Sequence, residues 1–539
     1  MITNSPARGP FGRASVLLFA LLACGAHTAA SAAAEPDSTT WYVSAGAAPG
    51  SVGSAEAPFD SLARVEAASR DGDTIVVQAA AAALDGGIAL KPGQQLIGDP
   101  VPNGAGLPRI TNTTSAHDGD AVRLATGAQV RNLVIAGARR GGIYGSDAAD
   151  VVISGNDVSA TNQQCADGFM IGPFGLPPTL PLGLAAPALP DFITLNNGWA
   201  AIMTDFSAAA GSVRIEGNTV HDTACGDGID VRAHGNSQVT AQLTGNTLRT
   251  INLGLVKLSV LAIGIQAGDT ARLTADLVNN TETDIAAPTA SVLNAVADSE
   301  GVFLNALGRA RMDITISGND FRNGSGNFSA NGLEYVTTSG SPQSEVHVTD
   351  STFENVTGDL IENYNLSTGG AHQSLTLDNV RAHHSTFPGA LLNSLVPANL
   401  GTCVVTTNFG RTAHTDLTIT NSDLADCSAD GIGLIAYTPT GSNPSTSELI
   451  FDIRDTTLNG AAANGINIIN VGDTAALRGS LTRVAISAAQ QALLHTSNSG
   501  GTIATASLDL SAVTLDGAAL DCLTGHPRVA LSGLPATCH

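Results

Sequence analysis

Residues Gly301-Val302-Phe303-Leu304 form a short apolar segment, and Ile314-Thr315-Ile316-Ser317-Gly318-Asn319-Asp320-Phe321 follow ten residues later. Apolar and polar residues alternate within these segments, which is typical of strands with one buried and one solvated face. The same pair, a strand after glycine and then a strand with an Asn or Asp turn, recurs from about Gly141 to Asp516. The chain is therefore built from one repeated unit.

The repeated unit spans roughly 27 to 43 residues, contains only short strands and turns, and cannot bury its apolar face alone. Such units are stable only when they stack on their neighbours. Helical repeats would require amphipathic stretches of about ten residues or more, which the sequence lacks. We therefore predict a parallel β-solenoid with stacked asparagines at one turn. The expected ladder positions are Asn156, Asn218, Asn246 and Asn319.

The start of the chain resembles the opening of secreted right-handed parallel β-helix proteins of the pectin-lyase-like superfamily. The segments that carry the resemblance are Trp41–Ser44, Ala57–Leu62, Gly72–Val77 and Leu90–Gln94. Together with the repeats, the resemblance covers nearly all of the mature chain and implies an all-β, right-handed parallel β-helix. It implies no single function, because this scaffold carries lyases, hydrolases, adhesins and inert spikes.

The expected domain organisation has three parts: a signal peptide at residues 1–34, an N-terminal cap with the first rungs at 35–100, and the β-helix at 101–539. Within the cap, Asp60 to Ser69 are expected to form a short helix with Leu62 and Val65 on one face. Such a helix would cover the open end of the first rungs and protect their unpaired strand edges.

The first residues predict export from the cytoplasm. Arg8 and Arg13 precede an apolar run from Ala14 to Ala23, and cleavage after Ala34 fits a signal peptide. Leu21-Leu22-Ala23-Cys24 also resembles a lipobox, so a lipid anchor at Cys24 is the alternative. We expect a secreted, periplasmic or extracellular protein, or a cell-envelope lipoprotein, with no transmembrane segment after the signal.

Removal of Cys24 leaves six cysteines, an even number that suits an oxidising compartment. Their positions favour three sequence-close disulfides, although six cysteines allow 15 pairings. The expected pairs are Cys165–Cys225, Cys403–Cys427 and Cys522–Cys538. None of these cysteines has the close spacing of a zinc site, so we expect no metal at them.

The composition argues against two classes of partner. The chain carries 24 Lys and Arg against 47 Asp and Glu, a formal net charge of -23. Nucleic acids and anionic membranes bind proteins through clusters of Lys and Arg. We therefore expect no nucleic acid partner, and the resemblance implies a polysaccharide or another glycan surface instead.

Two segments interrupt the repeat. Residues 166–212 contain several prolines, which cannot donate to a strand ladder, so we expect an excursion from the solenoid there. Leu391 to His414 is a second, smaller candidate. Long loops on a rigid scaffold often carry binding sites, but a loop that lies flat on the wall is an equal alternative.

The densest polar cluster runs from His221 to His234, directly after the first excursion. Asp227 and Asp230 would lie up to roughly 10 Å apart along an extended chain, near the upper limit for the carboxylates of an inverting glycosidase. One could act as general acid while the other activates water. The candidate catalytic residues are Asp222, Asp227, Asp230 and His234.

The orientation of these side chains decides whether they can act. If Ile229 and Val231 point into the core, Asp230 and Arg232 point toward solvent on the same wall. The alternative is a set of solvated turn residues beside a disulfide. The motifs of polygalacturonase-like glycosidases and the Arg-x-Pro-x-x-Arg of pectate-lyase-like enzymes are missing. A chain this acidic would also repel a polyuronate unless cations or a local basic patch intervened.

Outward positions of successive rungs could form a sugar-binding strip. Glu334 lies three rungs from Asp230, or roughly 14 Å at about 4.8 Å per rung, too far for a catalytic carboxylate pair. Exposed aromatic rings in such a strip would stack on sugars. The expected substrate-binding residues are Tyr144, Arg232, Gln266, Phe303 and Glu334.

No cofactor is predicted with certainty. Asp71-Gly72-Asp73 and Asp118-Gly119-Asp120 could supply oxygen ligands for calcium, but neither has the spaced acidic loop of an EF-hand. Three functions therefore stay open. The chain either binds polysaccharide without a reaction, acts as a polysaccharide lyase or glycoside hydrolase near Asp222 to His234, or serves as a non-catalytic adhesin or structural surface protein.

Overall fold

A computed structural model describes most of the chain after its first residues. The described residues are 38–99, 106–168, 179–180, 184–185, 198–254, 259–285, 298–324, 330–367, 369–386, 401–410, 412–437, 447–471, 476–498, 505–516, 521–525 and 529–532. The predicted signal peptide and Cys24 lie outside these residues, as do most of the proline-rich excursion, Cys538 and the side chain of Cys522. The expectations for those parts stay predictions.

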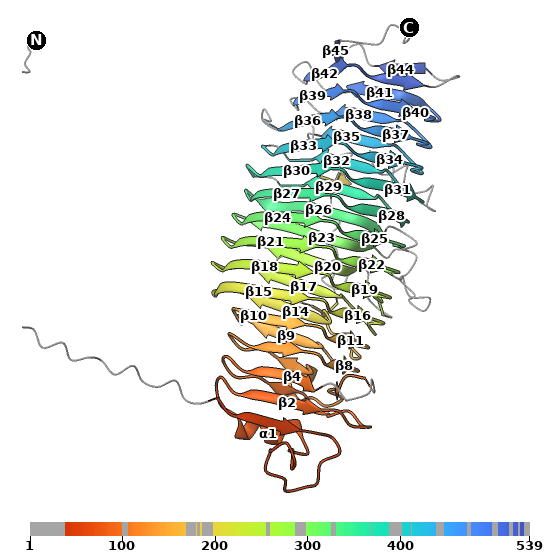
Figure 1. Cartoon of the computed structure of the whole chain (residues 1–539). Coiled ribbons are helices and arrows are strands. Elements are labelled where there is room, and N and C mark those ends of the chain that lie inside the picture. Colours follow the sequence, from red (N-terminus) through yellow and green to blue (C-terminus); the bar gives the residue numbers. More distant parts are fainter. Residues whose placement is uncertain are drawn as a thin grey trace, which may run out of the picture. The chain divides into compact units, whose positions relative to one another are not determined.

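Three long parallel sheets form the fold, and Figure 1 shows their strands stacked rung upon rung in chain order. Sheet A has 16 strands: β1 (Thr40–Val43), β2 (Thr74–Gln78), β4 (Gln95–Asp99), β7 (Gln129–Arg131), β10 (Val151–Ser154), β15 (Ala210–Glu216), β18 (Gln238–Thr244), β21 (Arg272–Val278), β24 (Arg311–Ser317), β27 (Gln343–Thr349), β30 (His372–Asp378), β33 (His414–Thr420), β36 (Glu448–Arg454), β39 (Ala476–Thr482), β42 (Thr505–Ser511) and β45 (Val529–Ser532).

Sheet B has 13 strands: β5 (Arg109–Ile110), β8 (Val134–Ala136), β11 (Asp157–Ser159), β16 (Thr219–His221), β19 (Thr247–Arg249), β22 (Thr281–Thr283), β25 (Asp320–Arg322), β28 (Thr352–Val356), β31 (Arg381–Ser385), β34 (Asp423–Ala425), β37 (Thr457–Asn459), β40 (Ala485–Ser487) and β43 (Thr514–Asp516). Sheet C has 14 strands: β3 (Ile88–Ala89), β6 (Val122–Arg123), β9 (Ile143–Ser146), β14 (Ile202–Phe206), β17 (Ile229–Ala233), β20 (Ser259–Ala267), β23 (Asp298–Gly308), β26 (Asn331–Gly340), β29 (Ile361–Asn365), β32 (Val404–Asn408), β35 (Ile432–Tyr437), β38 (Ile466–Val471), β41 (Ala492–Asn498) and β44 (Asp521–Gly525).

Most rungs contribute one strand to each sheet, and the apolar side chains at alternate positions fill one continuous core. The predicted right-handed parallel β-helix is thereby confirmed. Strands β14 and β32 pair within sheet C although they lie inside the ranges expected for the two excursions. A small antiparallel hairpin, β12 (Thr179–Leu180) with β13 (Leu184–Ala185), lies apart from the three sheets. Among the described residues, no helix has the length and apolar character to cross a membrane.

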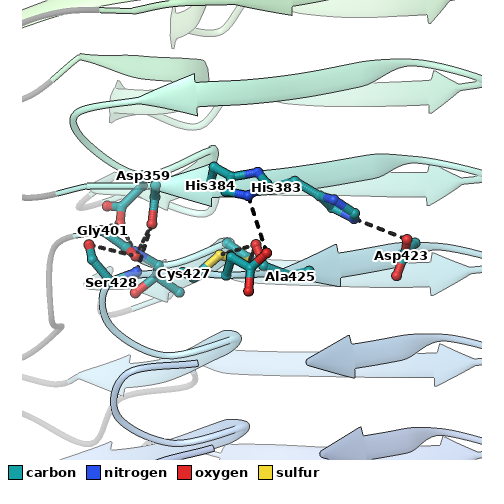
Figure 2. The surroundings of a disulfide bond; sticks show 12 residues. Asp359, His383, His384, Gly401, Asp423, Ala425, Cys427 and Ser428 are labelled. Carbon is teal, nitrogen blue, oxygen red and sulfur yellow. Dashed lines mark hydrogen bonds and ion pairs between the residues drawn. A yellow bond between two sulfur atoms is a disulfide. The ribbon is translucent and has the colours of Figure 1, made fainter. Parts of the chain in front are cut away.

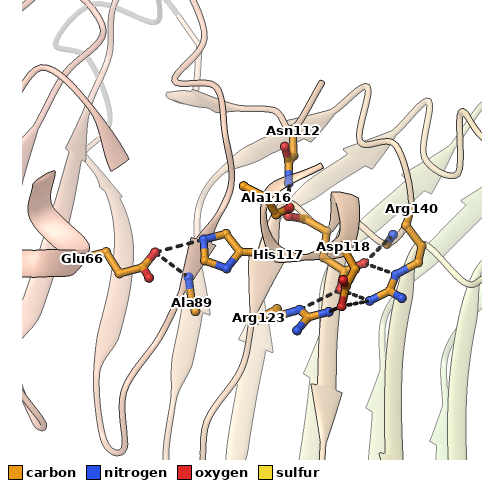
Figure 3. Close-up of polar contacts among 10 residues, drawn as sticks. Glu66, Ala89, Asn112, Ala116, His117, Asp118, Arg123 and Arg140 are labelled. Atoms are coloured by element: carbon orange, nitrogen blue, oxygen red, sulfur yellow. Dashed lines mark hydrogen bonds and ion pairs between the residues drawn. The ribbon is translucent and has the colours of Figure 1, made fainter. Parts of the chain in front are cut away.

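The expected capping helix is present as α1 (Leu62–Ala68), with Leu62 and Val65 buried. Its Glu66 ties it to the first rungs, as Figure 3 shows. The Glu66 carboxylate accepts the Ala89 backbone N–H at 3.0 Å and lies 3.1 Å from His117 Nε2. A short 3-10 helix, η1 (Ala116–Gly119), holds His117 in this position.

Stacked asparagines join sheets A and B at the turn between them. From Asn156 to Asn280, each buried amide donates to the side-chain oxygen of the asparagine in the next rung, at 3.0 to 3.1 Å. The ladder runs through Asn156, Asn218, Asn246, Asn280 and Asn319. The four predicted members are confirmed and Asn280 is added. Two predicted disulfides, Cys165–Cys225 and Cys403–Cys427, are also confirmed, and they are compatible with an extracellular location.

Candidate functional site

Asp227 belongs to a recurring row at the entry to sheet C. Its Oδ1 accepts the backbone N–H of Leu261 in the next rung at 2.8 Å. In other rungs, the residue two positions before the first inward side chain of the sheet C strand accepts a backbone N–H of the next rung in the same way. These residues are Asp120, Asn331, Asp359 and Asp430. A turn cap is a structural role, because it satisfies a buried N–H that has no ladder partner. The recurrence of Asp-Gly-Ile at 227–229 and 430–432 was the signal for it.

Asp230 and Arg232 do not face solvent, so the prediction of an exposed pair is wrong. They lie on the face opposite to the core residues Ile229 and Val231, but neither side chain has any exposed surface. The Arg232 guanidinium pairs with the Asp230 carboxylate and lies 4.0 Å from Asp227 Oδ2. Alternation along a strand predicts which way a side chain points, but it does not predict whether that face is covered.

Arg232 pairs with the Asp230 carboxylate and lies 4.0 Å from Asp227 Oδ2, so both carboxyl groups belong to one buried ion-pair cluster. Burial raises the pKa of both groups, and the neighbouring Asp230 carboxyl raises that of Asp227 further. Neither side chain has any surface exposed to solvent. The geometry therefore argues against these two residues as the acid and base of a hydrolase.

The predicted sugar-binding strip is also not an open surface. The register places Asp230 in one row with Gly264, Phe303 and Glu334, which confirms the three-rung distance to Glu334. Gln266 is not in this row: it pairs with Arg232, because β20 begins four residues before Ile263, the partner of Ile229. Phe303 and Gln266 each keep only 1% of their surface exposed, so neither ring nor amide is available to a sugar.

Two other predicted site residues lie apart from the buried cluster of Asp227, Asp230 and Arg232. Asp222 directly follows β16 of sheet B, and its carboxylate contacts His221 Nδ1 at 2.6 Å. Tyr144 is half-buried on sheet C, in edge contact with Trp199 at 5.0 Å between ring centroids. Burial raises the pKa of Tyr144, so its hydroxyl stays protonated at neutral pH. The four proposed catalytic residues therefore do not form one site.

The sequence reasoning missed Asp205, which places a carboxylate beside His234. Asp205 Oδ1 lies 3.1 Å from His234 Nε2, and both side chains are partly exposed, at 12% and 21%. The contact is short but poorly aligned for a hydrogen bond. Burial raises the pKa of Asp205, although His234 and Arg232 act to lower it. A register argument could have found Asp205, because it pairs directly with Arg232.

The carboxylates predicted as possible calcium ligands bind arginine side chains and N–H donors instead. Figure 3 shows Asp118 facing the guanidinium groups of Arg123 and Arg140. Asp120 binds Arg140 through two bonds, at 2.7 and 2.8 Å, and also receives the Gly141 N–H. In the other candidate, Asp73 accepts bonds from Thr39, Arg70 and Trp41. Guanidinium groups and N–H donors occupy these carboxylates, so they do not fit a cation.

A second histidine cluster lies beside the Cys403–Cys427 disulfide on sheet B, as Figure 2 shows. His383 Nε2 contacts Asp423 at 3.0 Å, and His384 Nε2 contacts Asp426 at 3.2 Å. Glu354 lies near both rings but already binds two arginines, Arg322 at 2.9 Å and Arg381 at 3.3 Å. The cluster is thus an ion-pair network with its own cations.

An open groove of about 330 Å³ crosses the outer face of sheet A. It runs over β21, β24, β27 and β30 and is lined mostly by polar side chains. The register makes Arg272, Arg311, Gln343 and His372 direct neighbours in one row. A second row holds Thr274, Asp313 and Glu345. The groove therefore offers donors and acceptors from rigid strands, about 4.8 Å apart.

Arg272 and Arg311 are unusual within this groove. Both are exposed, and they lie side by side on neighbouring strands, where like charges repel. In the part of the chain that the structure describes, neither guanidinium forms an ion pair or a side-chain hydrogen bond. Two adjacent guanidinium groups without carboxylates suit an anionic ligand group.

Comparison with known proteins gives only distant matches. No protein-family model matches the chain, and no curated protein matches it. The pectate lyase Pel9A structure is 13% identical, with a TM-score of 0.32, over 71% of this chain and 76% of that one. The mannuronan C-5 epimerase AlgE4 A-module of Azotobacter vinelandii is 12% identical, with a TM-score of 0.29, over 88% and 94%. PfbA, a surface adhesin of Streptococcus pneumoniae, is 9% identical, with a TM-score of 0.23, over 88% and 87%. At these values the matches carry no argument about a reaction.

Proposed function

We propose that this protein is an exported β-helix that binds an acidic polysaccharide along the outer face of sheet A. The observation that carries the proposal is the pair of adjacent guanidinium groups of Arg272 and Arg311 in the open groove, which form no ion pair with the residues that the structure describes. They bring positive charge to a groove on a chain of net charge -23, and Asp313 and Glu345 also line that groove.

The repeating geometry of the groove favours a polymer over a small ligand. Each rung places one side chain in the same outward row, so successive units of an extended chain can each contact one rung. Gln343 offers both an amide donor and a carbonyl acceptor, and Glu345 accepts. The hydroxyl groups of a sugar can bond to such donor and acceptor positions, and the carboxylates or sulfates of an acidic polysaccharide can bind the arginines.

Titration of the purified full chain with acidic and neutral polysaccharides tests the proposal. We expect a polyuronate to bind, a neutral glucan to bind far more weakly, and salt to weaken the binding. Arg272→Ala with Arg311→Ala should reduce the affinity at least tenfold, since each charge-assisted bond contributes about 1.5–3 kcal/mol. Arg454→Ala is the matched control, because Arg454 is an exposed sheet A arginine already paired with Asp452. Equal binding by the double variant and the control would refute the proposed site.

The pair of Asp205 and His234 supports a second candidate, a reaction on a polysaccharide at sheet C. A partly exposed imidazole beside a carboxylate can transfer protons, and such contacts often tighten only when substrate is bound. Assays for reducing ends and for unsaturated products across a polysaccharide panel test this candidate. Loss of product in both His234→Ala and Asp205→Asn, with binding at the sheet A groove retained, would establish it. No product from the unmodified chain would exclude it for that panel.

A further inference from the structure

We infer that His372, His414 and Asp416 form a binding site for a divalent transition-metal ion such as Zn²⁺. The three side chains come from neighbouring strands β30 and β33 and stand on the outer face of sheet A. Their candidate ligand atoms all lie within 4.8 Å of one another. The site goes beyond polysaccharide binding and does not depend on it.

The distances suit a small tetrahedral ion. Asp416 Oδ2 lies 3.3 Å from His372 Nε2, and Asp416 Oδ1 lies 3.2 Å from His414 Nε2. Ligand atoms on a tetrahedral zinc ion are about 3.3 Å apart, given Zn–N and Zn–O bonds of about 2.0–2.1 Å. Two imidazoles and one carboxylate select zinc and its neighbours over calcium or magnesium.

The outer shell of His414 also fits a metal ligand. His414 Nδ1 lies 3.2 Å from Glu448 Oε2, and Glu448 Oε1 is held by Arg478 at 2.5 Å. A carboxylate at Nδ1 fixes the N–H there and leaves the Nε2 lone pair directed at Asp416. A neutral imidazole between two carboxylates has only one N–H to donate. One carboxylate therefore faces a lone pair unless a proton or a metal ion lies between them.

The two rings lie close together, so a positive charge on both is unfavourable. The rings of His372 and His414 are stacked at 4.8 Å between centroids, with an angle of 21° between their planes. Two imidazolium rings at this distance would repel each other. A single divalent ion between the rings and Asp416 would remove the repulsion and satisfy all three groups.

The cluster of Glu354, His383 and His384 provides an internal contrast. There, Arg322 and Arg381 contact Glu354, and Arg381 also donates to His383 Nδ1. Guanidinium groups thus hold the positions that a metal ion would need. Among the described residues around His372 and His414, no arginine contacts the three proposed ligands; Arg478 contacts only Glu448.

The test uses untagged, full-length protein freed of metal. Calorimetric titration with ZnCl₂ at pH 7.5 should give one site, and Co²⁺ should produce the visible absorption of a tetrahedral site. His414→Ala and Asp416→Asn should each weaken Zn²⁺ binding at least 100-fold. Glu448→Gln should weaken it about 10- to 100-fold, as expected for an outer-shell carboxylate. His383→Ala with His384→Ala should leave it unchanged.

Two outcomes would overturn the site. One is the absence of Zn²⁺ and Co²⁺ binding at millimolar metal by the unmodified chain, which would leave an ion-pair cluster only. The other is equal loss of binding in the His383/His384 variant. Because His372 and His414 stand on the surface of a rigid sheet, their alanine variants should keep the thermal transition of the unmodified chain. A melting curve on each variant checks this point, and none of these measurements requires a polysaccharide.

Discussion

The guanidinium of Arg232 pairs with the carboxylate of Asp230, and neither side chain has any exposed surface. Asp230→Leu would remove the nearest partner of the buried Arg232 charge; Asp227 Oδ2 lies 4.0 Å from it, and Asp205 pairs with Arg232 in the strand register. We expect this change to cost about 3–5 kcal/mol in the free energy of unfolding, because arginine cannot lose its proton. The double change Asp230→Leu/Arg232→Met should cost much less. Urea unfolding followed by circular dichroism measures both, with the exposed Arg214→Ala as control. A double variant as unstable as the single one would contradict this account.

The asparagine ladder should be intolerant of truncation. Asn246→Ala removes bonds to the Ile215 carbonyl, to Asn280 and from Asn218, all buried. Each buried group left without a partner costs about 1–3 kcal/mol, so we expect a loss of several kcal/mol in the free energy of unfolding. Gln242→Ala, on the exposed face of β18, should change stability little. Comparable denaturation midpoints for the two variants would show that the ladder is dispensable.

Glu282 should make the fold less stable as pH rises. Its side chain is fully buried between Leu248 and Phe321, and its carboxyl oxygens have no hydrogen-bond partner within the described chain. Burial raises the pKa of Glu282 well above its ordinary value. Above about pH 4.3 the unfolded chain loses this proton while the folded chain keeps it, so stability falls by up to about 1.4 kcal/mol per pH unit.

Glu282→Gln removes this ionisation and keeps the shape of the side chain. The stability advantage of the variant should therefore grow between pH 4 and pH 8, measured by denaturation at each pH. Glu345→Gln, an exposed change on β27, is the control and should follow the unmodified chain. Parallel pH profiles for Glu282→Gln and the unmodified chain would mean that Glu282 is not buried in solution.

Asp147 should have the opposite effect to Glu282 on the pH dependence of stability: it should make the fold more stable as pH rises. Partial burial raises the pKa of this carboxyl, but bonds from Ser207, Ala208 and Ala209 outweigh that effect and lower it to about 2. The carboxylate therefore stabilises the fold above about pH 4, and this contribution is lost as pH falls toward 2. Asp147→Asn should cost on the order of 1 kcal/mol at pH 7, given the solvent screening at this site. Thermal unfolding from pH 7 to 2 should show the difference disappear, and Asp313→Asn should show none.

Much of the architecture was predictable because it depends on local patterns. Apolar and polar residues alternate in segments that repeatedly follow a glycine, and this pattern indicated the strands. The apolar face of each unit indicated that the units stack on one another. Asn156, Asn218, Asn246 and Asn319 were found because each follows an apolar strand at the same offset. Asn280 was missed because Thr281-Glu282-Thr283 replaces the apolar segment that marks the other turns.

The candidate sites depended on information that the pattern does not contain. Alternation placed Asp230 and Arg232 opposite the core, but only the structure showed that this face is covered. The row in which Gln266 lies depends on how β20 pairs with β17. A shift of this pairing by two residues leaves every side chain on the same face, so the alternation of apolar and polar residues does not reveal it.

His372 and His414 stand 42 residues apart in the sequence, and neither neighbourhood marks a site. The sequence by itself determined that the chain stacks into parallel rungs, because each unit has an apolar face that it cannot bury alone. Only the tertiary structure decided which polar side chains meet on neighbouring rungs and which of them reach solvent. Which side chains meet depends on the strand register, and which of them reach solvent depends on whether other residues cover that face of the sheet. Both are properties of several rungs together.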